Sequence, residues 1–186
     1  MGALLLVAAI CAGLVWAGSV PRPAPPLSLL TLSGQQISLQ SFRGKVVLLE
    51  FFLTDCPHCQ RTAGTIGPIY KEWRARGLEV LAVAINPDAK EHIPEFRQRF
   101  GATYPIALGD RQMVRDFADI SAVRQFFVPY IFLIDRAGVI RYEHDGNDRA
   151  FYENEAVNLR LELDTLLKEK EPAPVRKTAG KAPRKG

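Results

Sequence analysis

The sequence VVLLEFFLTDCPHC, residues 46–59, decides the fold. Residues 46–53 are apolar except for Glu50, and such a run is typical of a central strand covered on both faces. Cys56 follows three residues later, and Pro57 suits the first position of a helix, where its missing N–H costs nothing. The stretch therefore predicts a buried strand that leads directly into a helix, with Cys56 at the start of the helix.

The pattern on either side of this stretch alternates strands with helices, which predicts an α/β protein with a sheet covered on both sides. Gly64, Gly67 and Pro68 predict a kink or a break in the helix after Cys56. The chain offers one domain, residues 27–170, and no internal repeat. The expected elements are a hairpin over Leu27–Gln40, a helix from Cys56 to about Arg76, a strand over Leu78–Ile85, helices over Ala89–Phe100 and Arg111–Ala118, a hairpin of Tyr130–Ile134 with Val139–Glu143, and a closing helix over Phe151–Lys170.

The N-terminal residues 1–20 read as a signal peptide or an N-terminal anchor. Ala3–Ala17 is a continuous apolar run, whose length fits the core of a signal peptide better than a full membrane span. No Lys or Arg precedes the run, so an uncleaved anchor that reaches Val20 and tethers the chain to a membrane stays open. Either reading predicts an extracytoplasmic domain, joined through a proline-rich linker, residues 21–26, with Cys11 functionally silent.

The basic charge of the chain is concentrated at its C-terminus. The net charge is +4, yet residues 171–186 hold five basic residues and one acidic residue, and the charges of the remaining chain balance. A positive net charge that comes from the C-terminal tail alone does not indicate nucleic-acid binding. The tail is rich in proline and almost free of apolar residues, so we expect residues 171–186 to be disordered.

Cys56 and Cys59 carry the expected chemistry. Export would place them in a compartment where disulfides form. A disulfide between residues this close in sequence cannot cross-link distant parts of a fold, so the C-x-x-C pair indicates redox chemistry or metal binding. Unpaired N–H groups and the dipole at a helix N-terminus stabilise an anion, and the thiolate is the nucleophilic form of cysteine. We expect Cys56 to form a mixed disulfide with substrate and Cys59 to resolve it, leaving a Cys56–Cys59 disulfide.

Three neighbours are expected to tune or serve this pair. A charged His58 favours the Cys56 thiolate, whereas the carboxylate of Asp55 opposes it. Glu50 is the only charged residue of its strand, and desolvation should raise its pKa toward neutrality, so that it exchanges a proton with Cys59. The competing interpretation of Glu50 is an ion pair with Lys45 or an Arg.

Val128 and Pro129 form the candidate substrate-binding segment. Proline at the start of a strand fits either an edge strand or a cis peptide bond. A cis bond would leave the backbone C=O and N–H of Val128 free to pair with the backbone of a protein substrate.

These motifs resemble the thioredoxin superfamily, and within it the exported TlpA/ResA-like branch that is grouped with the alkyl hydroperoxide reductase/thiol-specific antioxidant (AhpC/TSA) proteins. The resemblance covers about Leu27–Leu167 and rests on LSLLTLSGQQISLQSFRGKVVLLEFF, on CPHC and on VPYIFLIDRAGVI. It implies a thioredoxin-like fold with a central mixed sheet and an N-terminal β-hairpin extension. It also implies that Pro129 is a cis proline beside Cys56 and that Glu50 is the buried acid. Asp55 departs from the family, which usually has Trp there.

The predicted function is therefore a thiol-disulfide oxidoreductase that acts on protein cysteines as a monomer, more as a reductant than as an oxidant, together with an upstream redox partner. No cofactor or metal is expected. A peroxiredoxin is one alternative, but its mechanism requires a Thr three residues and a Pro seven residues before the reactive Cys, where this chain has Leu53 and Leu49. A copper or zinc binder is the other, although His92 and His144 read as isolated surface residues and a zinc site needs four ligands.

Overall fold

The apolar run forms the centre of the sheet. In the computed structural model, which describes residues 19–170, strand β4 (Val46–Phe52) is buried along its whole length. It pairs in parallel with β5 (Leu78–Ala84) and antiparallel with β7 (Tyr130–Ile134). A strand with neighbours on both sides and helices on both faces has no exposed position, which explains why its sequence is almost continuously apolar.

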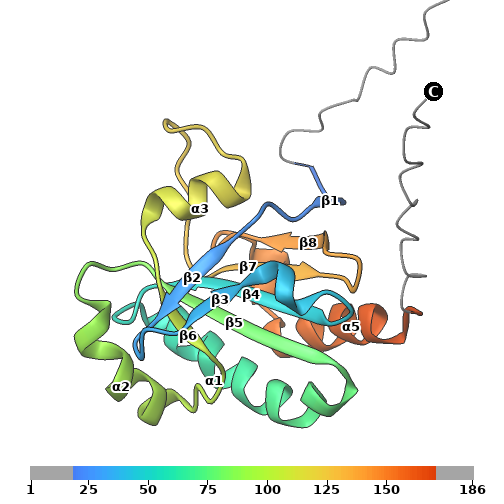
Figure 1. Ribbon diagram of the computed structural model, residues 1–186, viewed down its shortest axis with the longest axis horizontal. Helices are drawn as coiled ribbons and strands as arrows, with labels where there is room; N and C mark the ends of the chain where they lie inside the picture. Colours follow the sequence, from blue (N-terminus) through green and yellow to red (C-terminus); the bar gives the residue numbers. More distant parts are fainter. Residues whose placement is uncertain (1–18, 171–186) are drawn as a thin grey trace, which may run out of the picture.

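The sheet is mixed and has the order β1-β8-β7-β4-β5-β6-β2-β3 (Figure 1). The hairpin expected over Leu27–Gln40 is present as β2 (Ser28–Thr31) and β3 (Gln36–Ser38), and it extends the sheet beyond β6. The second expected hairpin pairs β7 with β8. The remaining strands are β1 (Arg22–Pro23), β6 (Ile106–Leu108) and β8 (Val139–His144).

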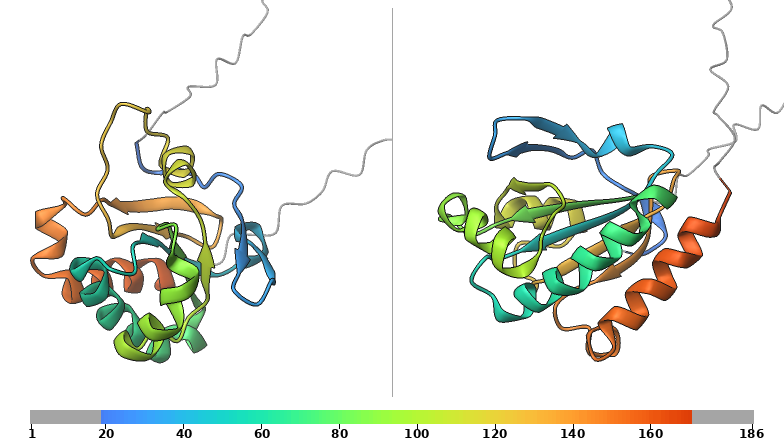
Figure 2. Two further views of the ribbon diagram at one scale, coloured as in Figure 1. Left: turned by 90° about the vertical axis from the view of Figure 1, so that its left-hand side faces the viewer. Right: turned by 90° about the horizontal axis from the view of Figure 1, so that it is seen from below.

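Helices cover the two faces of the sheet unequally. One face packs against α1 (Pro57–Trp73), α2 (Ala89–Phe100) and α5 (Glu155–Lys168), and the other packs against α3 (Arg111–Ala118). Figure 1 shows α3 on the opposite side of the sheet from α1 and α2, and Figure 2 shows α1 and α5 side by side beneath the strands. Side chains alternate along a strand, so Leu48, Glu50 and Phe52 of β4 face α1 and α5.

Two helices differ from their predictions. Of the kink or break predicted near Pro68, the break is wrong, because α1 runs without interruption from Pro57 to Trp73 with Pro68 inside it. Gly67 has a packing role there, since a Cβ at this position would lie 2.6 Å from the carbonyl oxygen of Gly101.

The single closing helix expected over Phe151–Lys170 is also wrong. The segment forms α4 (Arg149–Tyr152) and then α5, and the side-chain amide of Asn158 donates to the carbonyls of Ala150 and Phe151. These bonds satisfy the last turn of α4 and so stabilise the break between the two helices.

The segment predicted to be a linker takes part in the domain. Arg22 and Pro23 form β1, which pairs with Ile140 and Val139 of β8, and Arg22 makes a salt bridge to Glu143 at 3.0 Å. The predicted signal peptide or anchor up to residue 18, Cys11 and the predicted tail over residues 171–186 lie outside the described residues. Within residues 19–170 no helix is both long enough and apolar enough to span a membrane.

Candidate redox site

The two cysteines lie where β4 meets α1. Cys56 is the N-cap residue of α1, with an extended backbone, and Pro57 occupies the first helical turn. The sulfur of Cys56 accepts a hydrogen bond from the backbone N–H of Cys59 at 3.3 Å. Cys56 is partly exposed, whereas Cys59 is fully buried against the core. The fold therefore presents one sulfur to solvent and keeps the other beneath it.

The surroundings of Cys56 favour its thiolate. The hydrogen bond from the Cys59 side chain, together with the backbone N–H groups of Cys59 and His58, lowers the pKa of Cys56 to about 6. Burial and the negative charge of Asp55 act in the opposite direction and are outweighed. At neutral pH Cys56 is therefore mostly ionised, which is the reactive state of a thiol.

The surroundings of Cys59 have the opposite effect. Burial raises the pKa of the Cys59 thiol far above its ordinary value, and the hydrogen bond to Cys56 and the charge of Glu50 add to the increase. The site thus holds a thiolate and a thiol side by side. This asymmetry lets one sulfur attack first and keeps the second protonated until a base removes its proton.

Glu50 lies beneath the pair, on the face of β4 that packs against α1 and α5. Its side chain is 1% exposed. Burial raises its pKa well above the ordinary value, and the charges of Glu155 and Cys56 raise it further. The ion pair with Lys45 or an Arg is not found within residues 19–170, where the Oε1 atom of Glu50 has no hydrogen-bond partner. Glu50 is therefore available to exchange a proton.

Val128 and Pro129 lie across from the Cys56 sulfur. Their peptide bond is cis, and the carbonyl oxygen of Val128 is 4.0 Å from the sulfur of Cys56. Gly146 packs against this segment: its N–H donates to the carbonyl of Phe127 at 3.0 Å, and a Cβ at position 146 would lie 2.6 Å from the Val128 oxygen. The backbone of Val128 is thus held beside the reactive sulfur.

The side chain of His58 does not provide the positive charge that was expected beside Cys56. Burial and the nearby Arg61 lower the pKa of His58, so its imidazole is mainly neutral at pH 7. Its ring lies edge-on to Tyr152, with ring centroids 4.4 Å apart. The stabilisation that His58 gives to the Cys56 thiolate comes from its backbone N–H.

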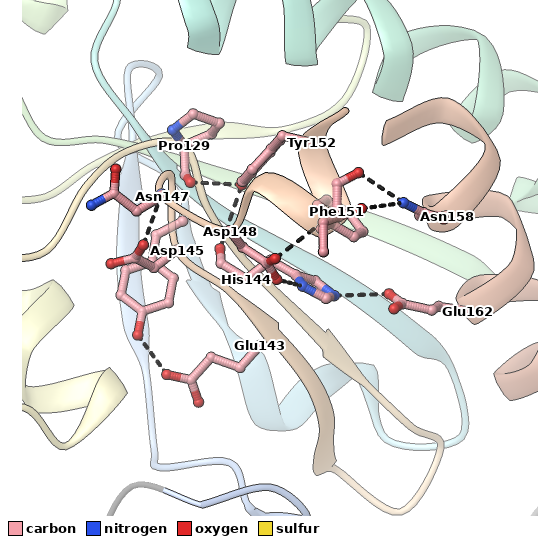
Figure 3. Close-up of polar contacts among 12 residues, drawn as sticks. Pro129, Glu143, His144, Asp145, Asn147, Asp148, Phe151, Tyr152, Asn158 and Glu162 are labelled. Atoms are coloured by element: carbon pink, nitrogen blue, oxygen red, sulfur yellow. Dashed lines mark hydrogen bonds and ion pairs between the residues drawn. The ribbon is translucent and has the colours of Figure 1, made fainter. Parts of the chain in front are cut away.

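Tyr152 is a site residue that the sequence did not indicate. Its hydroxyl donates to the carbonyl of Pro129 at 2.7 Å (Figure 3). Its ring contacts the ring of His58. It therefore connects the C-P-H-C motif with the cis-proline segment. Only the packing of α4 against both segments brings Tyr152 there, and no local sequence signal marks it.

The expectation that His144 is an isolated surface residue is wrong. Its side chain is 11% exposed and lies between two carboxylates, with Asp148 at 2.7 Å from Nδ1 and Glu162 at 2.9 Å from Nε2 (Figure 3). Burial lowers the pKa of His144, but the bonds to Glu162 and Asp148 outweigh burial and raise it. The ring connects β8 with α5, and its protonated form, which the raised pKa favours, can donate from both nitrogens. His92, by contrast, is exposed.

Solved structures place this fold among the thioredoxins. A thioredoxin-family thiol:disulfide interchange protein from Chlorobium tepidum aligns with a TM-score of 0.66 and 24% identity, over 80% of this chain and 98% of its own. A second structure from that organism, described as a putative thiol:disulfide interchange protein DsbE, aligns with a TM-score of 0.63 and 22% identity, over 77% and 96% of the two chains.

Two relatives share more of this sequence. The chain is 31% identical to the thiol-disulfide oxidoreductase ResA of Geobacillus kaustophilus, over 66% of this chain and 67% of ResA. It is 33% identical to the thioredoxin-like protein YneN of Bacillus subtilis, over 67% and 71% of the two chains. Fold, site and relatives together define a thioredoxin-like thiol-disulfide oxidoreductase of the TlpA/ResA type. The AhpC/TSA family model matches residues 20–143, and the chain belongs to that family.

Proposed function

We propose that the protein exchanges electrons with cysteines of other proteins through Cys56 and Cys59. The observation that carries this proposal is the asymmetric pair: a partly exposed Cys56 whose pKa is lowered to about 6, and a buried Cys59 whose thiol stays protonated. A nucleophilic thiolate at the surface and a protected resolving thiol are the two components that disulfide exchange requires.

The exchange proceeds in two steps. The Cys56 thiolate attacks a substrate disulfide, so that a mixed disulfide forms and one substrate sulfur leaves as a thiolate. Glu50 then takes the proton of Cys59, whose thiolate attacks the Cys56 sulfur, closes the Cys56–Cys59 disulfide and releases the second substrate sulfur. The substrate gains two electrons and the cysteine pair loses two. The cis segment at Val128 and Pro129 aligns the substrate backbone beside Cys56.

Glu50 becomes a better-placed base when the second step begins, because its ionisation depends on the charge of Cys56. The Cys56 thiolate is one of the charges that raise the pKa of Glu50. That charge disappears when Cys56 enters the mixed disulfide, so Glu50 ionises more readily at the moment when Cys59 needs a base. The carboxyl is thereby coupled to the state of the neighbouring sulfur.

The direction of electron flow that we propose is reduction of the substrate. A strongly lowered pKa stabilises the reduced pair and makes it oxidising, as in DsbA, where the pKa is about 3.5, whereas thioredoxin lies near about 7. Cys56, with a pKa of about 6, falls nearer to thioredoxin. The tuning neighbours Asp55 and Pro57 belong to this balance, Asp55 by opposing the thiolate and Pro57 by starting the helix.

The location that we propose is extracytoplasmic. The apolar run Ala3–Ala17 supports export, either with cleavage or as a membrane tether. A domain kept reduced in an oxidising compartment needs an upstream partner that returns its electrons, and we propose such a partner together with a monomeric state.

A thiol peroxidase is the alternative within the same family. Thr54, the nearest threonine to Cys56, is buried, and its hydroxyl accepts a hydrogen bond from Asn86 at 2.8 Å. Consumption of peroxide by the purified protein without a thiol partner would support this alternative. A copper or zinc protein remains the alternative outside the enzymes; within residues 19–170 no three His, Cys, Asp or Glu residues form a metal-binding group.

The reduction potential of the Cys56–Cys59 pair tests the proposed direction. Equilibration of the exported domain with glutathione or dithiothreitol buffers should give a value nearer to about −270 mV than to about −120 mV. A value near about −120 mV would make the protein an oxidant and would contradict the proposal. A variant with Asp55→Asn should be more oxidising, because removal of the opposing charge favours the thiolate.

A further inference from the structure

A second carboxyl lies near Glu50, at the start of α5. Glu155 is partly buried, and its charge is the second largest cause of the raised pKa of Glu50, after burial. A buried acid that faces another acid rather than a cation is an arrangement in which the two carboxyls cannot easily ionise together. They are therefore suited to share one proton.

Buried polar atoms without a hydrogen-bond partner occur on both carboxyls and on the face of α1 that covers them. Glu50 Oε1, Thr62 Oγ1 and Glu155 Oε1 are all buried and without a hydrogen bond of good geometry among the described residues. Thr62 lies one helical turn beyond Cys59, is 0% exposed, and still lowers the pKa of Glu155 through its hydroxyl. Buried polar atoms normally bond to one another or to ordered water, so these unpartnered groups are suited to hold a shared proton.

Glu155 also reaches toward solvent. Its Oε1 atom is buried, while its Oε2 atom accepts a hydrogen bond at 3.5 Å from Thr65, a partly exposed residue of α1. Tyr104 is a further buried group of the cluster, but it is 1% exposed and offers no exit. Glu50, Thr62 and Tyr104 are buried, whereas the Glu155 side chain is partly exposed, so Glu155 is the member of the cluster that can reach solvent.

We propose that Glu155 is a relay and positioning residue for the exchange reaction, which takes up from Glu50 the proton released by Cys59 and passes it to solvent at the start of α5. The inference rests on the proposed function. In the forward direction the Cys59 S–H bond breaks, the proton moves to Glu50, and the carboxyl pair loses one proton at Glu155. In the reverse direction the same atoms return a proton to Cys59. Glu155 acts through Glu50 and does not touch the substrate.

The charged and titratable groups in and around this pair come from β4, α1, α4 and the segment before β6, and they must all be considered in any pH profile. They are Glu50 on β4, Cys56 at the N-cap of α1, Cys59 and Arg61 on α1, Tyr104 before β6, and Tyr152 on α4. Arg61 favours the ionised form of Glu155, while burial opposes it, and the pKa of Glu155 is raised overall. The Glu155 carboxyl is thereby kept ready to hold a proton.

The test is a stopped-flow reaction of the reduced protein with an aromatic disulfide whose leaving thiolate is coloured. The first phase reports attack by Cys56 and the second reports resolution by Cys59. Glu155→Gln should leave the first phase unchanged and slow the second about tenfold at neutral pH, a modest share of the usual gain from acid–base catalysis. Glu155→Asp should recover part of the rate. Glu153→Gln, at an exposed neighbouring position, is the matched control and should behave as wild type.

A second phase with the wild-type rate and pH profile in Glu155→Gln would overturn the relay. If Glu50→Gln slows that phase and Glu155→Gln does not, the proposed function stands and the relay fails. If the wild-type protein shows neither phase, the proposed function itself fails. A carbon-13 titration of the glutamate carboxyls in the wild-type protein needs no variant: the relay predicts coupled titration of Glu50 and Glu155, and two independent single-site curves would contradict it.

Discussion

Replacement of Cys56 by serine is expected to reduce disulfide exchange with a protein substrate to the rate measured without the protein. Serine keeps the size and the N-cap geometry, but its hydroxyl does not ionise near neutral pH and cannot form a disulfide. The loss should therefore be complete, while the thermal stability of the domain stays close to that of wild type. Reduction of a disulfide-bonded test protein such as insulin, followed by its turbidity, measures the rate.

Cys59→Ser is the matched variant, and its expected behaviour is different. Cys56 still attacks, but the buried resolving sulfur is missing, so the mixed disulfide between Cys56 and the substrate should accumulate and be visible by mass spectrometry. If Cys56→Ser retained exchange activity, or if Cys59→Ser turned over without a trapped adduct, the division of roles between the two sulfurs would be wrong.

Glu50→Gln is expected to slow release of the mixed disulfide by about a hundredfold at neutral pH, within the usual range for loss of a general base. A base acts in its ionised form, so the wild-type rate of release should rise with pH as Glu50 loses its proton, and the Gln variant should lack this rise. Glu79→Gln, which removes a carboxylate from the neighbouring strand β5, is the control and should keep the wild-type profile. Identical rates for wild type and Glu50→Gln between pH 6 and pH 8 would exclude Glu50 as the base.

The same variant should change the stability of the domain in a predictable direction. The pKa of Glu50 is raised in the folded state, so the unfolded chain releases this proton at lower pH than the folded chain. Stability is therefore lost as the pH rises from the ordinary pKa of a glutamate through the raised value. Glu50→Gln removes this loss, and the variant should gain stability over wild type as the pH increases.

The sequence predicted those parts of the fold that are written in local patterns. The apolar run of β4 marked the central strand, because burial on both faces leaves no polar position. Both hairpins were also recognisable, since the alternation of residues and the turns lie within a few positions of each other. Strand β1 was not recognisable, because a segment of two residues cannot show an alternation of apolar and polar side chains. Only its pairing with β8 defines it as a strand.

The residues of the candidate site also fall into those that the local sequence indicates and those that only the fold brings together. Cys56, Cys59 and Glu50 could be selected because they lie within ten consecutive positions at the end of one strand. Tyr152 and Glu155 come from the far end of the chain and reach the site only through the packing of α4 and α5. The charge of His58 was misjudged for a related reason, since its burial beside Tyr152 depends on that same packing.

The most direct test is the pH dependence of alkylation at Cys56 in the reduced wild-type protein, with the modified sulfur identified by mass spectrometry. Iodoacetamide reacts with the thiolate, so the rate follows the ionised fraction of Cys56. The rate should reach half of its maximum near pH 6, as expected from a pKa of about 6, while Cys59 stays unmodified. A midpoint near the ordinary value of about 8.5 for a free thiol would contradict the account.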